Sequence, residues 1–286
     1  MKCTAYFVAS LMVVTAGCHR SRSAPNTKAQ PTTALPTPPQ PVPSGAASPP
    51  AACSPMKQAN VVFKTDDGVT LQADYYPSEH GHAAAVILLH MIPPNWDRTS
   101  YPSAFIDQLV GAGFSVLNVD RRGAGGSGGI ATEAYVGPGG ALDVKAAVGF
   151  LATQPCRFAE QKLVVVGASN GTTSALDYAV LAQRKQVTQG AVTPATPPVA
   201  ALVFLSPGPY TEKQNPFATA ATLFKTTPIL FMFPDTEAAW PSQFQTAAPA
   251  AWQFLRFDKG AHGTIMFEVR PIAMANVVNF IAGAVR

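Results

Sequence analysis

Six short, uninterrupted apolar runs alternate with segments of helical spacing, and this alternation constrains the fold more than any other feature. The runs are AAVILLH at 84–90, FSVLNVD at 114–120, KLVVVGA at 162–168, VAALVFLS at 199–206, PILFMF at 228–233 and QFLRFD at 253–258. Helical spacing covers 103–111, 139–153, 172–183, a short stretch near 240–250, and 271–285. Strands buried on both faces have this continuous apolar character. We therefore expect a mainly parallel sheet covered by helices on both faces, with right-handed crossovers.

Two further β-type runs precede the alternation, within VVFKTDDGVTLQADYYP at 61–77. Asp66, Asp67 and Gly68 separate them, and an Asp-Gly pair between two strand-like runs is a strong hairpin signal. The expected sheet therefore has eight strands and an N-terminal antiparallel hairpin. With 286 residues, 47% of them apolar, the chain can bury a core of this size.

The first 55 residues differ from the rest and are expected to stay outside the folded domain. Lys2 precedes an apolar stretch from Ala5 to Gly17, which has about the length of a signal-peptide core and is too short to span a bilayer. The stretch from His19 to Pro55 holds ten prolines among Ser, Thr, Ala and Gln, a composition typical of an extended, solvated tether. We expect a signal peptide at 1–18, a tether at 19–55 and one folded domain at 56–286.

The apolar stretch ends in Thr15, Ala16, Gly17 and Cys18, which resembles the bacterial lipobox. This resemblance implies that Cys18 becomes the lipidated N-terminus of an envelope protein anchored to a membrane. The alternative is an ordinary cleaved signal with an incidental cysteine. His19 is not the aspartate that retains many lipoproteins in the inner membrane, which favours the outer membrane if the source is a Gram-negative cell.

Two cysteines remain in the exported part of the chain, Cys53 and Cys156. An oxidising compartment would permit a disulfide between them, and two unpaired thiols are the alternative.

Two ligand classes are not expected. The formal charge of +4 comes without a cluster of Lys or Arg, so the chain has no electrostatic footprint for nucleic acid. The run GAGGSG at 123–128 satisfies the dinucleotide-binding pattern G-x-G-x-x-G, but no helix opens on it, and Asp143 lies inside an expected helix. We expect these glycines to supply a flexible active-site rim.

A glycine-flanked serine stands at the end of the 162–168 run. Gly167, Ala168, Ser169, Asn170 and Gly171 form a G-x-S-x-G motif between an expected strand and an expected helix. Open α/β sheets bind ligands at the carboxyl ends of their strands, and the start of a helix directs free N–H groups to the same place. The motif therefore predicts a nucleophile elbow that carries Ser169.

A serine nucleophile needs a histidine base and an acid that orients the base. His262 is the only histidine that follows Ser169, and it lies in a glycine-flanked loop between the last strand and the last helix. Asp235 and Glu237 are the acidic residues in the loop directly after PILFMF. Either can orient His262. The usual strand-Gly-x-x-Asp pattern, read without a gap, puts Glu237 at the acid position, whereas a loop shorter by two residues favours Asp235.

Acyl transfer also requires donors that stabilise an oxyanion. One expected donor is the backbone N–H of Asn170, directly after the serine. The other is the N–H of Met91 or Ile92, because the two prolines that follow have no N–H. His90 is expected to end the strand and fix this loop rather than to act in catalysis.

Together these features resemble the α/β-hydrolase superfamily, most closely its small dienelactone-hydrolase-like and esterase-like members. The resemblance covers about residues 60–286 and rests on LLH, DRRG, GASNG followed by TTSAL, PILFMF and AHGT. It implies an α/β-hydrolase fold without a large cap, and hydrolysis of the carboxylic ester of a small or medium substrate through an acyl-serine intermediate. It implies no metal and no organic cofactor. Met91 stands where many relatives have glycine.

Two other functions are compatible with this pattern. A peptidase or amidase similar to the prolyl-oligopeptidase group shares the elbow, although no propeller or large cap is evident. A binding lipoprotein on a hydrolase scaffold that has lost catalysis is the second. Only about twenty residues separate Ser206 from Pro228, where large lids are usually inserted, so we expect an open site. The segments 207–210 and 215–217 are candidates for its apolar lining, and a plain connecting loop is the alternative.

Overall fold

One eight-stranded sheet organises the part of the chain that the structure describes. The computed structural model describes residues 56–78, 84–154, 162–189, 196–210 and 217–286. The strands are β1 (Gln58–Lys64), β2 (Thr70–Tyr76), β3 (Ala85–Leu89), β4 (Ser115–Val119), β5 (Leu163–Ala168), β6 (Val199–Leu205), β7 (Ile229–Pro234) and β8 (Trp252–Phe257). Their order in the sheet is β1-β2-β4-β3-β5-β6-β7-β8. The predicted number of strands is confirmed.

The strand pairing places the functional end of the sheet. The predicted hairpin forms between β1 and β2, and β2 pairs antiparallel with β4. The remaining pairs, from β4–β3 through β7–β8, are parallel. The chain winds from β3 to β4 on one side and then returns to β5 on the other side of β3. The topological switch point therefore lies between β3 and β5, and ligands bind at the carboxyl ends of the strands there in open α/β sheets.

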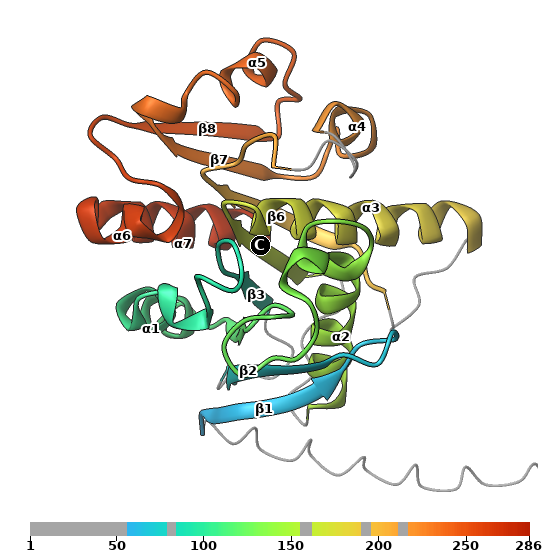
Figure 1. Cartoon of the computed structure of the whole chain (residues 1–286). Helices are drawn as coiled ribbons and strands as arrows, with labels where there is room; N and C mark the ends of the chain where they lie inside the picture. The colour runs from blue at the N-terminus through green and yellow to red at the C-terminus, as the bar shows by residue number, and fades with distance from the viewer. Residues whose placement is uncertain (1–55, 79–83, 155–161, 190–195, 211–216) are drawn as a thin grey trace, which may run out of the picture. The chain divides into compact units, whose positions relative to one another are not determined.

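Helices cover both faces of the sheet, as Figure 1 shows. The helices are α1 (Ser103–Gly111), α2 (Gly139–Thr153), α3 (Gly171–Gln189), α4 (Phe217–Leu223), α5 (Ser242–Gln245), α6 (Met266–Val269) and α7 (Ile272–Ala284). Side chains of α2 and α3 belong to the core on one face, and side chains of α1, α6 and α7 belong to the core on the other. The sheet is therefore the central layer of three.

The central strands explain the unbroken apolar runs. Val165 of β5 faces the α2 and α3 side, while Val164 and Val166 face the α1 and α7 side. All three are fully buried. Burying one such side chain contributes about 1.5–3 kcal/mol, so both faces of β5 must be apolar. A period-two pattern of polar residues would place polar groups in one of the two cores.

Two short helices, α4 and α6, were not predicted from sequence. Each is only one or two turns long, and isolated helices of this length are unstable in water. In α6 the buried side chains of Met266 and Phe267 pack into the core beside α1 and α7. Tertiary packing rather than local propensity therefore stabilises α6. The other helices form within a few residues of their predicted positions, and α3 is longer than expected.

Some expectations concern residues that the structure does not describe. The signal peptide at 1–18, the tether at 19–55, lipidation of Cys18 and the pairing of Cys53 with Cys156 lie outside the described residues. Among the described residues no single helix is both long and apolar enough to cross a bilayer. One pair of segments, Gly263–Val269 and Ile272–Ala284, reaches that length and apolarity when taken together, but the chain bends by 118° between them.

Candidate active site

Ser169 follows β5 directly and occupies a tight turn before α3. Its backbone has φ +51°, a left-handed conformation that residues with a side chain rarely adopt. Its N–H donates to Leu205 O at 2.8 Å, which ties the turn to the end of β6. Only glycine fits on either side, because a Cβ on Gly167 would lie 2.5 Å from Gly171 O, and a Cβ on Gly171 would lie 2.7 Å from His90 O. The turn thus presents Ser169 at the switch point of the sheet.

His262 connects this serine to a carboxylate. The Nε2 atom of His262 lies 2.8 Å from Ser169 Oγ, and Nδ1 lies 2.7 Å from Glu237 Oε1. In the neutral ring with its hydrogen on Nδ1, Ser169 Oγ–H donates to Nε2, and Nδ1–H donates to the carboxylate. A continuous hydrogen-bonded row therefore joins an alcohol, an imidazole and a carboxylate that are far apart in the sequence. The side chains of His262 and Glu237 are partly exposed, at 39% and 30%.

The structure distinguishes between the two acids that the sequence left open. Asp235 and Glu237 both lie in the one-turn 3-10 helix Asp235–Glu237 that follows β7. Glu237 reaches the imidazole of His262, whereas Asp235 Oδ1 is buried with no hydrogen-bond partner in the described part of the chain. Glu237 is therefore the acid that orients the ring in this geometry.

The carboxylate of Glu237 is held in its charged form. Burial raises the pKa of Glu237, but the hydrogen bond with His262, the Ser206 hydroxyl and the charge of His262 together bring it below the ordinary glutamate value. Glu237 Oε2 has no hydrogen-bond partner among the described residues. The Ser206 hydroxyl therefore acts on the carboxylate as a nearby dipole and not through a well-formed hydrogen bond. The charged carboxylate accepts the hydrogen bond from Nδ1–H and so fixes the orientation of the His262 ring.

Ser206 was not identified from the sequence, yet it supports the histidine loop. It follows β6, as Ser169 follows β5, and it has the same left-handed backbone, with φ +50°. Its hydroxyl accepts a hydrogen bond from the N–H of Gly263 at 2.9 Å. Since Gly263 is the neighbour of His262, this bond fixes the backbone that carries the base. The only sequence signal is a serine at the end of the strand next to the elbow strand.

Tyr210 lines the site, as expected for the segment 207–210. Its ring stands nearly perpendicular to the His262 ring, with the centroids 6.4 Å apart, and its hydroxyl donates to Ser206 O at 2.6 Å. Burial raises the pKa of Tyr210 to about 12, and the nearby Ser169 hydroxyl offsets part of this rise. Phe217, by contrast, is buried in the core against Trp240, so the expectation that it lines the site is wrong. The other two residues of the expected segment, 215 and 216, lie outside the described residues.

The expected oxyanion donors lie at the ends of β3 and β5. Within the described residues, the N–H groups of Asn170, Met91 and Ile92 have no acceptor in the protein. His90 is buried, and its Nδ1–H donates to Met91 O at 2.8 Å while Nε2 accepts from the Arg121 N–H at 2.9 Å. Burial, followed by the charge of Arg121, lowers the pKa of His90 to about 3, so the ring is neutral. His90 thus has the structural position predicted for it.

Arg121 is the second residue that the sequence did not reveal. It is fully buried, and its Nη1 donates to His90 O at 3.2 Å, to Met91 O at 3.1 Å and to Asn170 Oδ1 at 2.6 Å. Burial lowers its pKa to about 10, which leaves it charged at neutral pH. A trans peptide N–H points opposite to the preceding carbonyl. The N–H groups of Met91 and Ile92 therefore both face away from Arg121.

Comparisons with known proteins bear on the fold. The sequence matches no family model and no curated protein. Solved structures are similar: an esterase of Pyrococcus furiosus has a TM-score of 0.59 and 19% identity, over 81% of this chain and 92% of that one. An α/β hydrolase, GrgF, from Penicillium sp. has a TM-score of 0.56 and 14% identity, over 80% and 99%. The chain has the α/β-hydrolase fold.

A further structure with this fold, a dienelactone hydrolase from Anabaena variabilis, has a TM-score of 0.54 and 18% identity, over 80% of this chain and 96% of that one. At such identities the likeness concerns the α/β-hydrolase fold alone. The connection between β6 and β7 spans only 206–228, which is too short for a separate cap domain. The chemistry of this α/β-hydrolase scaffold must follow from its own side chains.

The glycine run after β4 is structural in this α/β-hydrolase fold. Gly126 N–H donates to Asp120 Oδ2 at 2.8 Å, and a Cβ on Gly125 would lie 2.1 Å from the same oxygen. Asp143, which the dinucleotide pattern would require as a ribose ligand, instead pairs with Arg122 at 2.8 Å. The glycines fold around a buried carboxylate rather than forming a free rim. Among the described residues no group of three or more His, Cys, Asp or Glu is placed to hold a metal ion.

Proposed function

We propose that this protein is a serine hydrolase that cleaves carboxylic esters of small or medium substrates through an acyl-serine intermediate. The hydrogen-bonded row of Ser169, His262 and Glu237 is the observation that supports this most strongly. The row lies at the switch point of an α/β-hydrolase sheet. The backbone N–H groups of Asn170, Met91 and Ile92, at the ends of β5 and β3, have no acceptor among the described residues. This arrangement combines a nucleophile, a base and oxyanion donors, which acyl transfer requires.

The first half of the reaction acylates the serine. Ser169 Oγ attacks the ester carbonyl carbon while its proton passes to His262 Nε2. Glu237 stabilises the imidazolium that forms. The tetrahedral intermediate then breaks its bond to the alcohol oxygen, and His262 gives its proton to that oxygen. An alcohol leaves, and the acyl group remains on Ser169.

The second half repeats these steps with water. His262 removes a proton from the water, which attacks the acyl carbon, and the proton returns to Ser169 Oγ as the acid is released. The N–H of Asn170, with that of Met91 or Ile92, holds the oxyanion in both halves. Each such donor is typically worth about 10²–10³ in kcat.

The proposal is tested by comparing Ser169→Ala with the wild type on short p-nitrophenyl esters. We expect the variant to lose turnover, while Ser242→Ala, which changes an exposed serine at the start of α5, retains it. Full activity in the Ser169→Ala protein would refute the proposal. Matched ester and anilide substrates separate an esterase from a peptidase or amidase, and we expect faster turnover of the ester.

The alternative of an inactive binding protein drew its support from the uncertain acid. The contact between Glu237 and His262 removes that support.

We also propose that Cys18 anchors the domain to the cell envelope, with 19–55 as the tether, on the strength of the sequence alone. Metabolic labelling with a fatty-acid analogue tests this anchoring. Label is expected on the wild type and absent from Cys18→Ser. An unlabelled wild type with an ordinary cleaved N-terminus would contradict it.

A further inference from the structure

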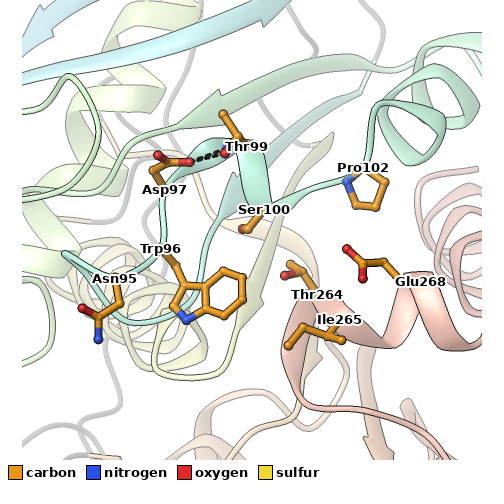
Figure 2. A pocket seen from close by; sticks show the side chains of 9 residues that line it. All are labelled: Asn95, Trp96, Asp97, Thr99, Ser100, Pro102, Thr264, Ile265 and Glu268. Atoms are coloured by element: carbon orange, nitrogen blue, oxygen red, sulfur yellow. Dashed lines mark hydrogen bonds between the residues drawn. The ribbon is translucent and has the colours of Figure 1, made fainter.

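A pocket of about 550 Å³ opens beside the loop that carries His262. Figure 2 shows its two walls: Trp96 and Ser100, from the segment between β3 and α1, face Thr264, from the turn that leads into α6, and Glu268 of α6. The volume lies within the range of small-molecule sites, roughly 300–1,000 Å³. Ser169 and His262 do not line this pocket, but one wall begins two residues beyond His262.

Two hydroxyl groups in this pocket have no partner in the described part of the chain. Thr264 is only 1% exposed, and its Oγ1 is buried with no hydrogen-bond partner; Ser100 Oγ is buried in the same way. Figure 2 shows Thr264 pointing into the pocket toward Ser100 and Trp96. Buried polar atoms are nearly always hydrogen-bonded in proteins, so these two hydroxyls indicate a polar ligand.

The other lining groups narrow the class of ligand. Asn95, Asp97 and Glu268 add an amide and two carboxylates, and neither carboxylate has an ion-pair partner among the described residues. Asp97 Oδ1 already accepts hydrogen bonds from the N–H and the hydroxyl of Thr99, so Glu268 is the carboxylate without a hydrogen bond in this part of the chain. Trp96 is 36% exposed and offers an apolar ring. The pocket thus combines an aromatic surface with several polar groups of mixed type.

The donor and acceptor inventory favours a polyol over a cation. Hydroxyls and amides both donate and accept, whereas carboxylates only accept. An ammonium group supplies donors alone and would leave the hydroxyl protons and the amide N–H₂ of Asn95 unpaired. A polyol supplies donors and acceptors along one carbon skeleton, and its C–H face can pack on Trp96.

The position of the pocket assigns the polyol to one side of the ester. In the proposed reaction His262 protonates the departing alcohol oxygen, so the alcohol part must lie beside His262. The wall containing Thr264 and Glu268 continues directly from the His262 loop. We propose that the substrates are acyl esters of a sugar or similar polyol and that this pocket binds the polyol. This inference rests on the proposed hydrolase function.

The overall step balances without a co-reactant other than water. The acyl carbon exchanges its bond to a polyol oxygen for a bond to Ser169 Oγ, and the serine proton passes through His262 to the polyol oxygen. Water then releases the acid and restores Ser169. The products are a free polyol hydroxyl and a carboxylic acid.

A panel of acetate esters with different alcohols tests the inference. The panel is a mono-O-acetylated methyl glucoside, ethyl acetate and acetylcholine, with acetate release measured for the full-length wild type. We expect kcat/KM for the glucoside ester to exceed that of the other two by about tenfold or more, since several hydrogen bonds are gained. Trp96→Ala and Glu268→Gln are expected to lower the glucoside-to-ethyl ratio by roughly three- to tenfold.

Controls keep the two proposals apart. Thr264→Val tests the buried hydroxyl with little change of shape, and Thr246→Val, at an exposed threonine after α5, is its matched control and is expected to keep the wild-type ratio. If Thr264→Val unfolds the protein, Glu268→Gln at an exposed position supplies the result. Reaction of each protein with a fluorophosphonate probe reports the hydrolase function separately.

Four outcomes are decisive. A preference for the glucoside ester that Trp96→Ala and Glu268→Gln reduce supports the inference. Probe labelling and ethyl acetate hydrolysis without this preference overturn the inference alone, and a preference for acetylcholine shows a cation site instead. A folded protein that neither labels nor hydrolyses any ester overturns the proposed function and this inference with it.

Discussion

The backbone N–H of Gly263 donates to the hydroxyl of Ser206 at 2.9 Å, and this bond fastens the His262 loop to the end of β6. Ser206 and Ser169 end neighbouring parallel strands with the same left-handed backbone. One serine presents its hydroxyl to the imidazole, and the other holds the backbone beside that imidazole. The ends of β5 and β6 therefore position both the nucleophile Ser169 and Ser206, which holds the loop of the base His262.

Removing this support should affect turnover more than substrate binding. We expect Ser206→Ala to lower kcat about tenfold with KM little changed, because misplacement of the base affects the transition state and not the bound ester. Steady-state kinetics on a p-nitrophenyl ester measure both constants. A loss confined to thermal stability, with kcat intact, would show that Ser206 has only a structural role.

The two acids near His262 should differ sharply in their effect. Glu237→Gln keeps the shape but no longer stabilises the imidazolium, and we expect kcat to fall by about 10³–10⁴. Asp235→Asn changes a group that does not reach the ring and should leave kcat within about threefold of the wild type. The reverse ranking of the two variants would assign the acid to Asp235.

Arg121 should be essential for the oxyanion loop. Arg121→Lys keeps a charge but lacks the planar fork that reaches His90 O, Met91 O and Asn170 Oδ1 together. We expect a loss of about 3 kcal/mol or more in the free energy of unfolding, because buried acceptors lose their donor. We also expect kcat to fall by at least about tenfold. Urea unfolding and ester kinetics test both effects, and unchanged kcat in a folded variant would contradict the role.

The ion pair between buried Arg122 and partly exposed Asp67 should make stability depend on pH in a definite direction. The hydrogen bond from Arg122 lowers the pKa of Asp67 below its ordinary value of 3.8. The folded state therefore binds fewer protons, so this stabilisation is fully present above 3.8 and is lost as the pH falls through the lower folded value. Asp67 is 39% exposed, and solvent screening limits the contribution to under about 1 kcal/mol.

Urea unfolding of the wild type and Asp67→Asn between pH 2 and pH 7 checks this linkage, the range being roughly that over which such a carboxylate titrates. We expect the difference between the two proteins to be constant near neutral pH and to shrink toward the acid end. A difference that does not change with pH would contradict it.

The sequence predicted the parts of the site that depend on local pattern. The strand before Ser169, the helix after it and the loop of His262 all have period or glycine signals, and each formed as expected. Contacts made only by tertiary folding gave no such signal. The 3-10 turn that selects Glu237 over Asp235 spans three residues, and the partners of Arg121 come from three separate segments.

Ser206 shows the same limit. It follows β6 in a segment whose composition suits an ordinary connection, and its role arises from the position of Gly263. The pocket beside Thr264 likewise joins two segments that are more than 150 residues apart in the chain. Local sequence therefore indicates where reactive groups lie, and packing determines what supports them.

The most direct test of the account is the site of covalent modification by a fluorophosphonate. The probe reacts with a serine only when a neighbouring base activates it, so peptide mass spectrometry of the labelled full-length protein identifies the nucleophile. We predict one adduct on Ser169, absent from Ser169→Ala and much slower to form in Glu237→Gln. A folded wild-type protein that carries the adduct elsewhere, or carries none, would contradict the central claim.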